Sequence, residues 1–99
     1  MAKAKPFDAA EYLDNPEMIA AYLTEALESN DQSLITKAIG NVARSHGMSE
    51  VAQKAGLSRE NLYRALRGDA KPEFDTIMKV LRALGINLVA QPQEPSQAA

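Results

Sequence analysis

The chain has 99 residues, a formal net charge of -2 and no cysteine. This length allows one domain with at most a short extension, and the lack of cysteine excludes a disulfide framework and a thiolate metal site. No apolar run reaches the roughly 18 residues of a membrane span, and the start lacks the apolar core of a signal peptide, so we expect a cytoplasmic protein with no membrane contact. Because His46 is the only histidine and neither a nucleophile–base pair nor a P-loop is present, we expect no enzyme, cofactor or metal site.

The first part of the chain is predicted to be an acidic helical extension. Residues 1–6 are expected to form a flexible arm, and residues 7–31 the extension itself. Asn15 and Pro16 predict a helix start, because Asn accepts hydrogen bonds from the first turn and Pro is tolerated there. The helix from about 16 to 29 carries one apolar face, composed of Ile19, Tyr22, Leu23, Ala26 and Leu27.

Residues 32–90 are predicted to form the main domain. A helix over 32–46 is capped by Asp31 and ended by Gly47, and a short helix over 50–55 is capped by Ser49. Another helix begins at Arg59, and a further amphipathic helix covers about 73–84. Residues 86–90 favour a short edge strand, which would need a partner strand from a second subunit or another protein. Residues 91–99 are rich in Gln, Pro, Ser and Ala and are expected to be disordered.

Residues 48–68 are typical of a helix-turn-helix. Ala52 permits a close helix approach, Gly56 supplies a left-handed helix end, and Ser58 caps the second helix. Five apolar positions fall where two short helices would face one core; they are Val51, Ala55, Leu57, Leu62 and Ala65. A helical hairpin without a DNA-binding role is the alternative interpretation.

In a helix-turn-helix, the second helix presents its first turns to base edges in the major groove. The residues predicted to contact bases are Arg59, Glu60, Tyr63 and Arg64. Those predicted to contact DNA phosphates are Ser49, Gln53, Lys54, Arg67 and Lys71. Arg59 and Glu60 could instead form a surface ion pair, and Tyr63 could instead pack against the surface of the two helices.

Charge is distributed unevenly along the chain. Residues 1–31 contain seven acidic side chains and two lysines, whereas residues 44–71 contain six basic and three acidic side chains. The first segment would repel DNA and the second would attract it. The alternative is that both segments are ordinary solvated helix faces.

Residues 34–84 resemble the lambda-repressor-like, Xre-type helix-turn-helix domains, and a longer stretch, about 7–90, resembles the addiction-module antidote proteins. The matching residues are Phe7-Asp8, Glu11-Tyr12-Leu13, Ile19-Ala20-Ala21-Tyr22-Leu23, Val42-Ala43-Arg44, Gly47-Met48-Ser49, Gly56-Leu57-Ser58-Arg59-Glu60-Asn61-Leu62-Tyr63 and Phe74-Asp75-Thr76. Lys71-Pro72 departs from the pattern, where Asn-Pro is expected.

The resemblance implies an all-α fold, a lambda-repressor-like five-helix DNA-binding domain, in a HigA-type antitoxin of a type II toxin-antitoxin pair. The implied protein partner is a small basic toxin of the RelE/ParE superfamily, encoded next to this chain. The implied nucleic-acid partner is double-stranded operator DNA, which a homodimer of the chain would bind to repress the shared operon. A stand-alone phage-type regulator and a purely protein-binding helical module are the alternative functions.

The N-terminal extension separates the antidote proteins from plain repressors, so we expect it to bind the toxin. Its acidic residues complement a basic toxin and its tyrosines can act as buried anchors. The residues expected at this contact are Asp8, Glu11, Tyr12, Glu17 and Tyr22. The alternative is that the aromatic and apolar residues of the extension simply pack on their own domain.

Overall fold

The computed structural model describes residues 15–93, which form five helices and no strand. The helices are α1 (Pro16–Glu28), α2 (Gln32–His46), α3 (Met48–Ala55), α4 (Arg59–Ala65) and α5 (Phe74–Ala83). The expected all-α class is therefore confirmed for these residues. The arm over 1–6, the segment 7–14 and most of the predicted C-terminal tail lie outside the described residues.

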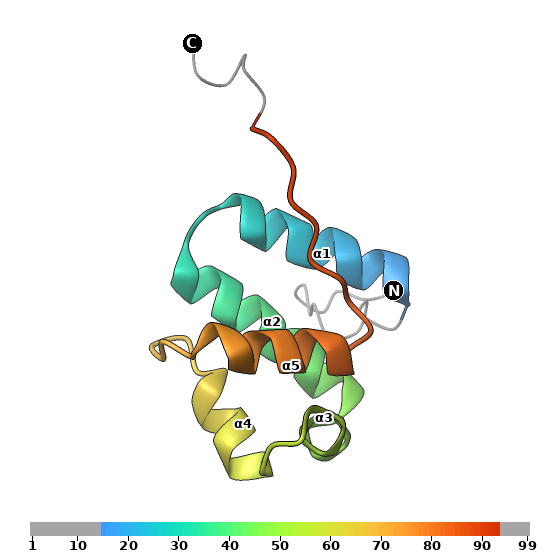
Figure 1. The fold of residues 1–99 in the computed structure, drawn as a ribbon, viewed down its shortest axis with the longest axis vertical. Helices are drawn as coiled ribbons and strands as arrows, with labels where there is room; N and C mark the ends of the chain where they lie inside the picture. Colours follow the sequence, from blue (N-terminus) through green and yellow to red (C-terminus); the bar gives the residue numbers. More distant parts are fainter. Residues whose placement is uncertain (1–14, 94–99) are drawn as a thin grey trace, which may run out of the picture.

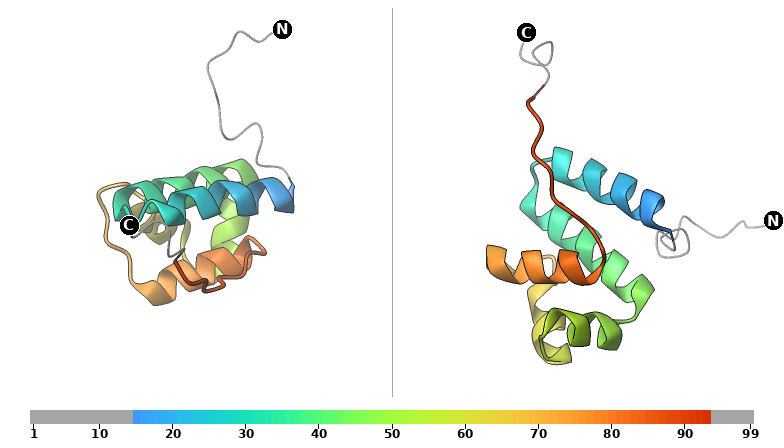
Figure 2. Two further views of the ribbon diagram at one scale, coloured as in Figure 1. Left: turned by 90° about the horizontal axis from the view of Figure 1, so that it is seen from above. Right: turned by 45° about the vertical axis from the view of Figure 1, so that its right-hand side comes forward.

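The helices are arranged so that α1 and α3–α4 lie at opposite ends of the molecule. Helix α1 packs beside α2 and runs in roughly the opposite direction (Figure 1). The far end of α2 contacts α3, which in turn packs on α4 and α5. Figure 1 and the right-hand view of Figure 2 both place α1 away from α3 and α4.

Three of the predicted helix caps are confirmed. The Asn15 side chain accepts a hydrogen bond from the Met18 N–H at 2.8 Å. Asp31 accepts from the N–H groups of Ser33 at 3.0 Å and Leu34 at 3.3 Å. Each cap satisfies N–H groups that have no partner within their own helix, which is why these local signals located the helix starts correctly. The third cap, Ser58, lies in the site described below.

The predicted cap of α3 is wrong. Helix α3 begins at Met48, its N-cap is Gly47, and no side chain caps it. The Gly47 N–H donates to the Ala43 carbonyl at 2.9 Å, while the Gly47 carbonyl accepts from the Val51 N–H at 3.0 Å. With φ at 103°, this glycine ends α2 and begins α3 in a single residue, so Ser49 lies inside the first turn.

The Asp31 cap provides a stability prediction. Replacing Asp31 with alanine removes the acceptor for two N–H groups of α2 and should lower the free energy of unfolding by about 1 kcal/mol. Urea unfolding followed by circular dichroism measures the change. Asp31→Asn, which keeps an acceptor oxygen, is the control and should lose much less; an equal loss in both variants would contradict capping as the cause.

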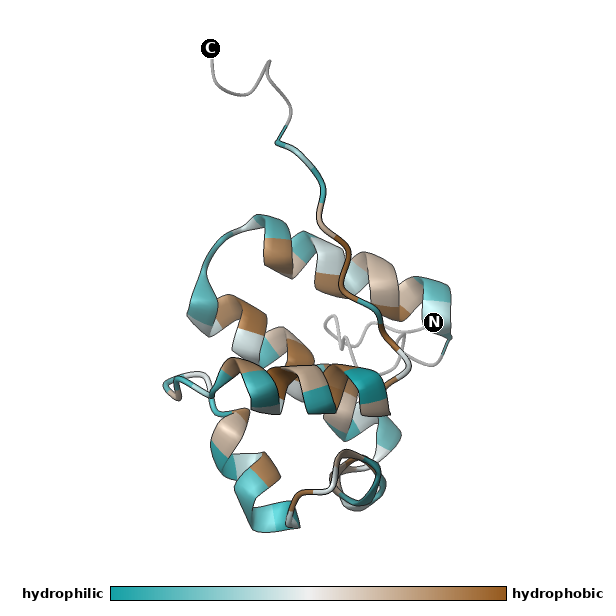
Figure 3. Cartoon of the chain, in the orientation of Figure 1, coloured by the Kyte–Doolittle hydropathy of each residue, from teal (hydrophilic) through white to brown (hydrophobic). Residues whose placement is uncertain are grey.

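One hydrophobic core holds the helices together. Its largest fully buried side chains are Val42 in α2, Val51 in α3, Leu62 in α4 and Val80 in α5. The apolar parts of the helices turn toward one another and the polar parts face outward (Figure 3). Helix α2 approaches the end of α4 closely at Gly40, where a Cβ atom would lie 3.2 Å from the Leu66 carbonyl oxygen.

Some large apolar side chains on the helices are not buried. Leu27, Leu34 and Phe74 are 39%, 46% and 70% exposed, respectively. All three follow the helical spacing of their neighbours, but Leu27 is the penultimate residue of α1, Leu34 the third of α2 and Phe74 the first of α5, so each lies near a helix end. Periodicity identified the helices correctly and overestimated the length of their buried faces.

The strand expected over 86–90 is not formed. The Ile86 N–H donates to the Leu81 carbonyl at 2.9 Å, and Ile86 packs on the core. The chain then continues to residue 93 without regular structure (Figure 2), leaving Val89 78% exposed. A strand requires a paired neighbour; the partner strand expected from the sequence belongs to a second subunit or another protein, and no strand within residues 15–93 lies beside this segment. Within the same range, no helix is long and apolar enough to cross a membrane.

Candidate nucleic-acid interface

Helices α3 and α4 are joined by a tight turn centred on Gly56. Gly56 adopts the left-handed conformation, with φ at 73°, and the Leu57 N–H donates to the Ala52 carbonyl at 2.9 Å. Ser58 then caps α4 by accepting from the Asn61 N–H at 3.0 Å. Ala52 is only 3% exposed, which agrees with the predicted need for a small residue. The local geometry predicted for residues 52–58 is therefore confirmed.

Helix α4 has one buried and one exposed face. Leu62 is completely buried and anchors the helix to the core. The four residues predicted to contact bases all lie on the exposed side; they are Arg59, Glu60, Tyr63 and Arg64. The structure thus gathers them on one helix surface that is open to a ligand.

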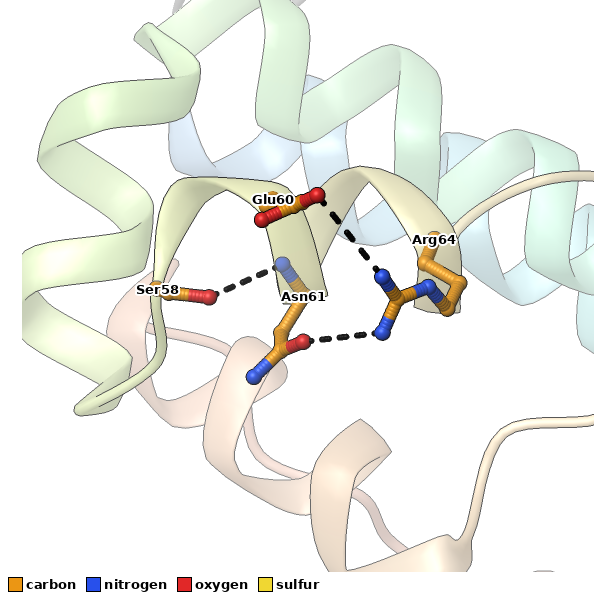
Figure 4. A network of polar contacts seen from close by, with 4 residues as sticks. All are labelled: Ser58, Glu60, Asn61 and Arg64. Atoms are coloured by element: carbon orange, nitrogen blue, oxygen red, sulfur yellow. Dashed lines mark hydrogen bonds and ion pairs between the residues drawn. The ribbon is translucent and has the colours of Figure 1, made fainter.

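Two arginines on this surface are held by neighbours on the same helix. Arg64 donates to the Asn61 side-chain oxygen at 3.1 Å and lies 3.9 Å from a Glu60 carboxylate oxygen (Figure 4). Arg59 donates to the Tyr63 hydroxyl at 3.3 Å, and its guanidinium carbon lies 5.5 Å from the centroid of the Tyr63 ring. Glu60 therefore lies beside Arg64 rather than forming the alternative pair with Arg59.

These contacts are exposed and weak. The side chains of Arg64 and Glu60 are 64% and 84% exposed, so water screens their attraction, which is worth at most about 1 kcal/mol. The contacts orient the guanidinium groups only weakly. A stronger acceptor, such as a base edge or a phosphate, could replace the present partners.

Sequence reasoning missed Asn61 as a member of this surface. Its side-chain oxygen accepts from Arg64, whereas its side-chain nitrogen makes no hydrogen bond within residues 15–93. Asn can pair with adenine through its amide group, so Asn61 belongs with the base-contacting candidates. The signal that could have found it was its place three residues after the Ser58 cap, in the first turn of α4.

The residues predicted to contact phosphates lie on both sides of α4. Ser49, Gln53 and Lys54 are exposed on α3, whereas Arg67 and Lys71 are exposed in the loop over 66–73. Figure 1 shows α4 between α3 and this loop. Lys54 forms an ion pair with Glu50 at 3.1 Å and Arg67 one with Asp69 at 3.2 Å. The cationic residues therefore lie on the elements that precede and follow α4.

The residues predicted to bind the toxin are described only in part. Asp8, Glu11 and Tyr12 lie outside the described residues. Glu17 is exposed in the first turn of α1. Tyr22 is half-buried, and its hydroxyl accepts a hydrogen bond from the Asn41 side chain of α2 at 2.7 Å. For Tyr22 this contact agrees with the alternative interpretation, packing within the chain.

Comparison with known proteins identifies the family. A sequence model of the family described as "Probable addiction module antidote protein" matches residues 3–92. An uncharacterized protein from Haemophilus influenzae is 46% identical to the chain over 87 residues, which cover 88% of this chain and 90% of that protein. No solved structure matches the chain. The chain belongs to the family of probable addiction module antidote proteins.

Proposed function

We propose that this protein is the antitoxin of a type II toxin-antitoxin module, and that it neutralises a small basic toxin of the RelE/ParE superfamily by direct binding. The match of residues 3–92 to the antidote family carries this proposal, because an antidote requires a cognate toxin. We further propose that it represses its own operon as a HigA-like, Xre-type DNA-binding protein. Both activities belong in the cytoplasm, and neither is enzymatic.

The proposed DNA-binding unit is a helix-turn-helix formed by α3 and α4, in a domain of lambda-repressor-like fold. Three observations support it: the tight turn at Gly56, the Ser58 cap and the exposed polar face of α4 above the buried Leu62. A recognition helix needs this combination, since it must be anchored to the core on one side and reach base edges on the other. Two such helices in a homodimer would meet half-sites about 34 Å apart.

The proposed toxin-binding surface consists of α1 and of the acidic segment that precedes it in the sequence. Glu17, Glu25 and Glu28 are all exposed on α1, so this helix adds negative charge that complements a basic toxin. Helix α1 lies at the opposite end of the molecule from α3 and α4 (Figure 1). This separation supports toxin and DNA binding at different surfaces of one chain.

Co-expression with the adjacent reading frame tests the antitoxin function. We expect induction of the neighbouring gene alone to stop bacterial growth and co-expression of this chain to restore it. A variant beginning at Asn15 should restore growth poorly, because it lacks Asp8, Glu11 and Tyr12. Colony counts on inducing medium measure the rescue.

Two controls make this experiment decisive. Thermal unfolding of the shortened chain establishes that it still folds, and pull-down of the tagged toxin reports direct binding. A neighbour that is harmless when expressed alone would contradict the proposal and favour the stand-alone regulator. Full rescue and full toxin binding by the shortened chain would show that residues 1–14 are dispensable.

A further inference from the structure

The loop over 66–73 is fastened to α2 by two contacts around Gly68. The Ser33 hydroxyl donates to the Gly68 carbonyl oxygen at 2.9 Å. A Cβ atom at Gly68 would lie 2.8 Å from Cε and 3.0 Å from Cγ of Lys37, so the aliphatic part of Lys37 lies directly across this glycine. The Lys37 side chain therefore ends beside a loop that is far from it in the sequence.

This contact brings the Lys37 stem to a loop that carries two further cations. Arg67 precedes Gly68 and Lys71 follows it by three residues, and both are exposed, as is Lys37. Arg67 forms an ion pair with Asp69 at 3.2 Å. Among the described residues, neither Lys37 nor Lys71 has an acidic partner. A loop and a helix that both carry cations next to their contact attract an anion such as a phosphate.

We infer that Lys37, together with Arg67 and Lys71, forms a binding site for a phosphate of the DNA backbone beside the end of α4. This inference rests on the proposed DNA-binding function and adds to it a residue from outside α3, α4 and their loop. The packed stem holds the Lys37 ammonium group near the loop, and lysine binds phosphate as a compact point charge. A phosphate held there would fix the position of α4 along the groove without reading sequence.

Gly68 leaves room for the Lys37 stem to lie close to the loop backbone. A side chain at this position would occupy space that the Lys37 stem fills, and the stem would have to shift. Gly68 thus serves the proposed site through close approach and not through an unusual backbone angle.

Lys37→Met is the sharpest test, because methionine keeps an unbranched apolar stem over Gly68 and removes the charge. The full-length protein is titrated with duplex DNA from the region upstream of its own gene at about 50 to 200 mM salt. We expect the slope of log K against log salt to become shallower by about 0.9, the value for one phosphate contact. Binding should weaken by a similar factor for specific and unrelated duplexes.

Two further variants serve as controls. Lys79→Met makes the same substitution at an exposed lysine on α5, a helix to which no DNA contact is assigned, and should leave the slope unchanged. Lys37→Arg should retain the wild-type slope. Thermal unfolding of each variant establishes that the fold is intact.

The outcomes separate this inference from the proposed function. Salt-dependent binding by wild type with an identical slope for Lys37→Met would overturn the Lys37 site and leave the helix-turn-helix proposal standing. A changed base preference without a changed slope would also overturn it, as would a loss confined to toxin binding. If the wild-type protein bound no DNA at any salt concentration, the DNA-binding half of the proposed function would itself fail.

Discussion

Replacing Leu62 with alanine is expected to lower the free energy of unfolding by about 2–5 kcal/mol. Leu62 is completely buried and is the residue of α4 that joins the core formed with Val51 and Val80. Alanine would lose the transfer free energy of the removed carbons and leave a cavity that a small domain cannot fully close. Because domains are stable by only about 5–15 kcal/mol, this variant would approach the limit of folding.

Urea unfolding monitored by circular dichroism measures this loss. Leu27→Ala removes the same atoms from a side chain that is 39% exposed on α1 and should cost far less. Equal losses in the two variants would contradict the placement of Leu62 as the anchor of α4. Leu62→Met, which nearly conserves volume, should cost less than about 1.5 kcal/mol and keep α4 in place.

Arg64→Ala is expected to weaken binding to the operator by about 1–3 kcal/mol and to relax the sequence preference at one base pair. Arg64 lies on the exposed face of α4, with its guanidinium group beside Asn61 and Glu60. A guanidinium group can donate two parallel hydrogen bonds to guanine, and losing them affects one base pair more than the others. Folding should be almost unaffected, because both contacts of Arg64 within α4 are exposed.

A set of duplexes that differ by single base pairs measures this change. Arg82→Ala is a matched control, since Arg82 is also exposed but lies near the end of α5. Arg64→Ala should flatten the preference at one position and the control should not. Uniform weakening across all duplexes, with a shallower salt slope, would instead assign Arg64 to a phosphate and refute its base-reading role.

The sequence was sufficient wherever a structural feature depends on neighbours within a few residues. Asn15, Asp31 and Ser58 were identified as caps because an N-cap contacts the two or three residues that follow it. Gly56 was identified as a helix end because only glycine adopts the left-handed conformation without steric cost. The exposed side of α4 followed from helical spacing about the buried Leu62.

Prediction was less successful where one residue serves two elements or needs a distant partner. Gly47 ends α2 and begins α3, which displaced Ser49 from the expected cap. Residues 86–90 have the composition of a strand, but the described residues contain no strand to pair with them. Composition can favour an extended backbone, whereas pairing depends on what the rest of the chain places beside it.

By itself, then, the sequence determined the helices, three of their caps and four of the exposed polar residues on α4, because these depend on local dihedral preferences and on a fixed helical period. Only the tertiary structure decided that Tyr22 bonds to Asn41 and that Lys37 lies across Gly68. Both contacts join residues on separate elements, and they form only when core packing fixes the distance between helices. No local pattern encodes such distances, so the proposed phosphate site at Lys37 becomes visible only in the folded chain.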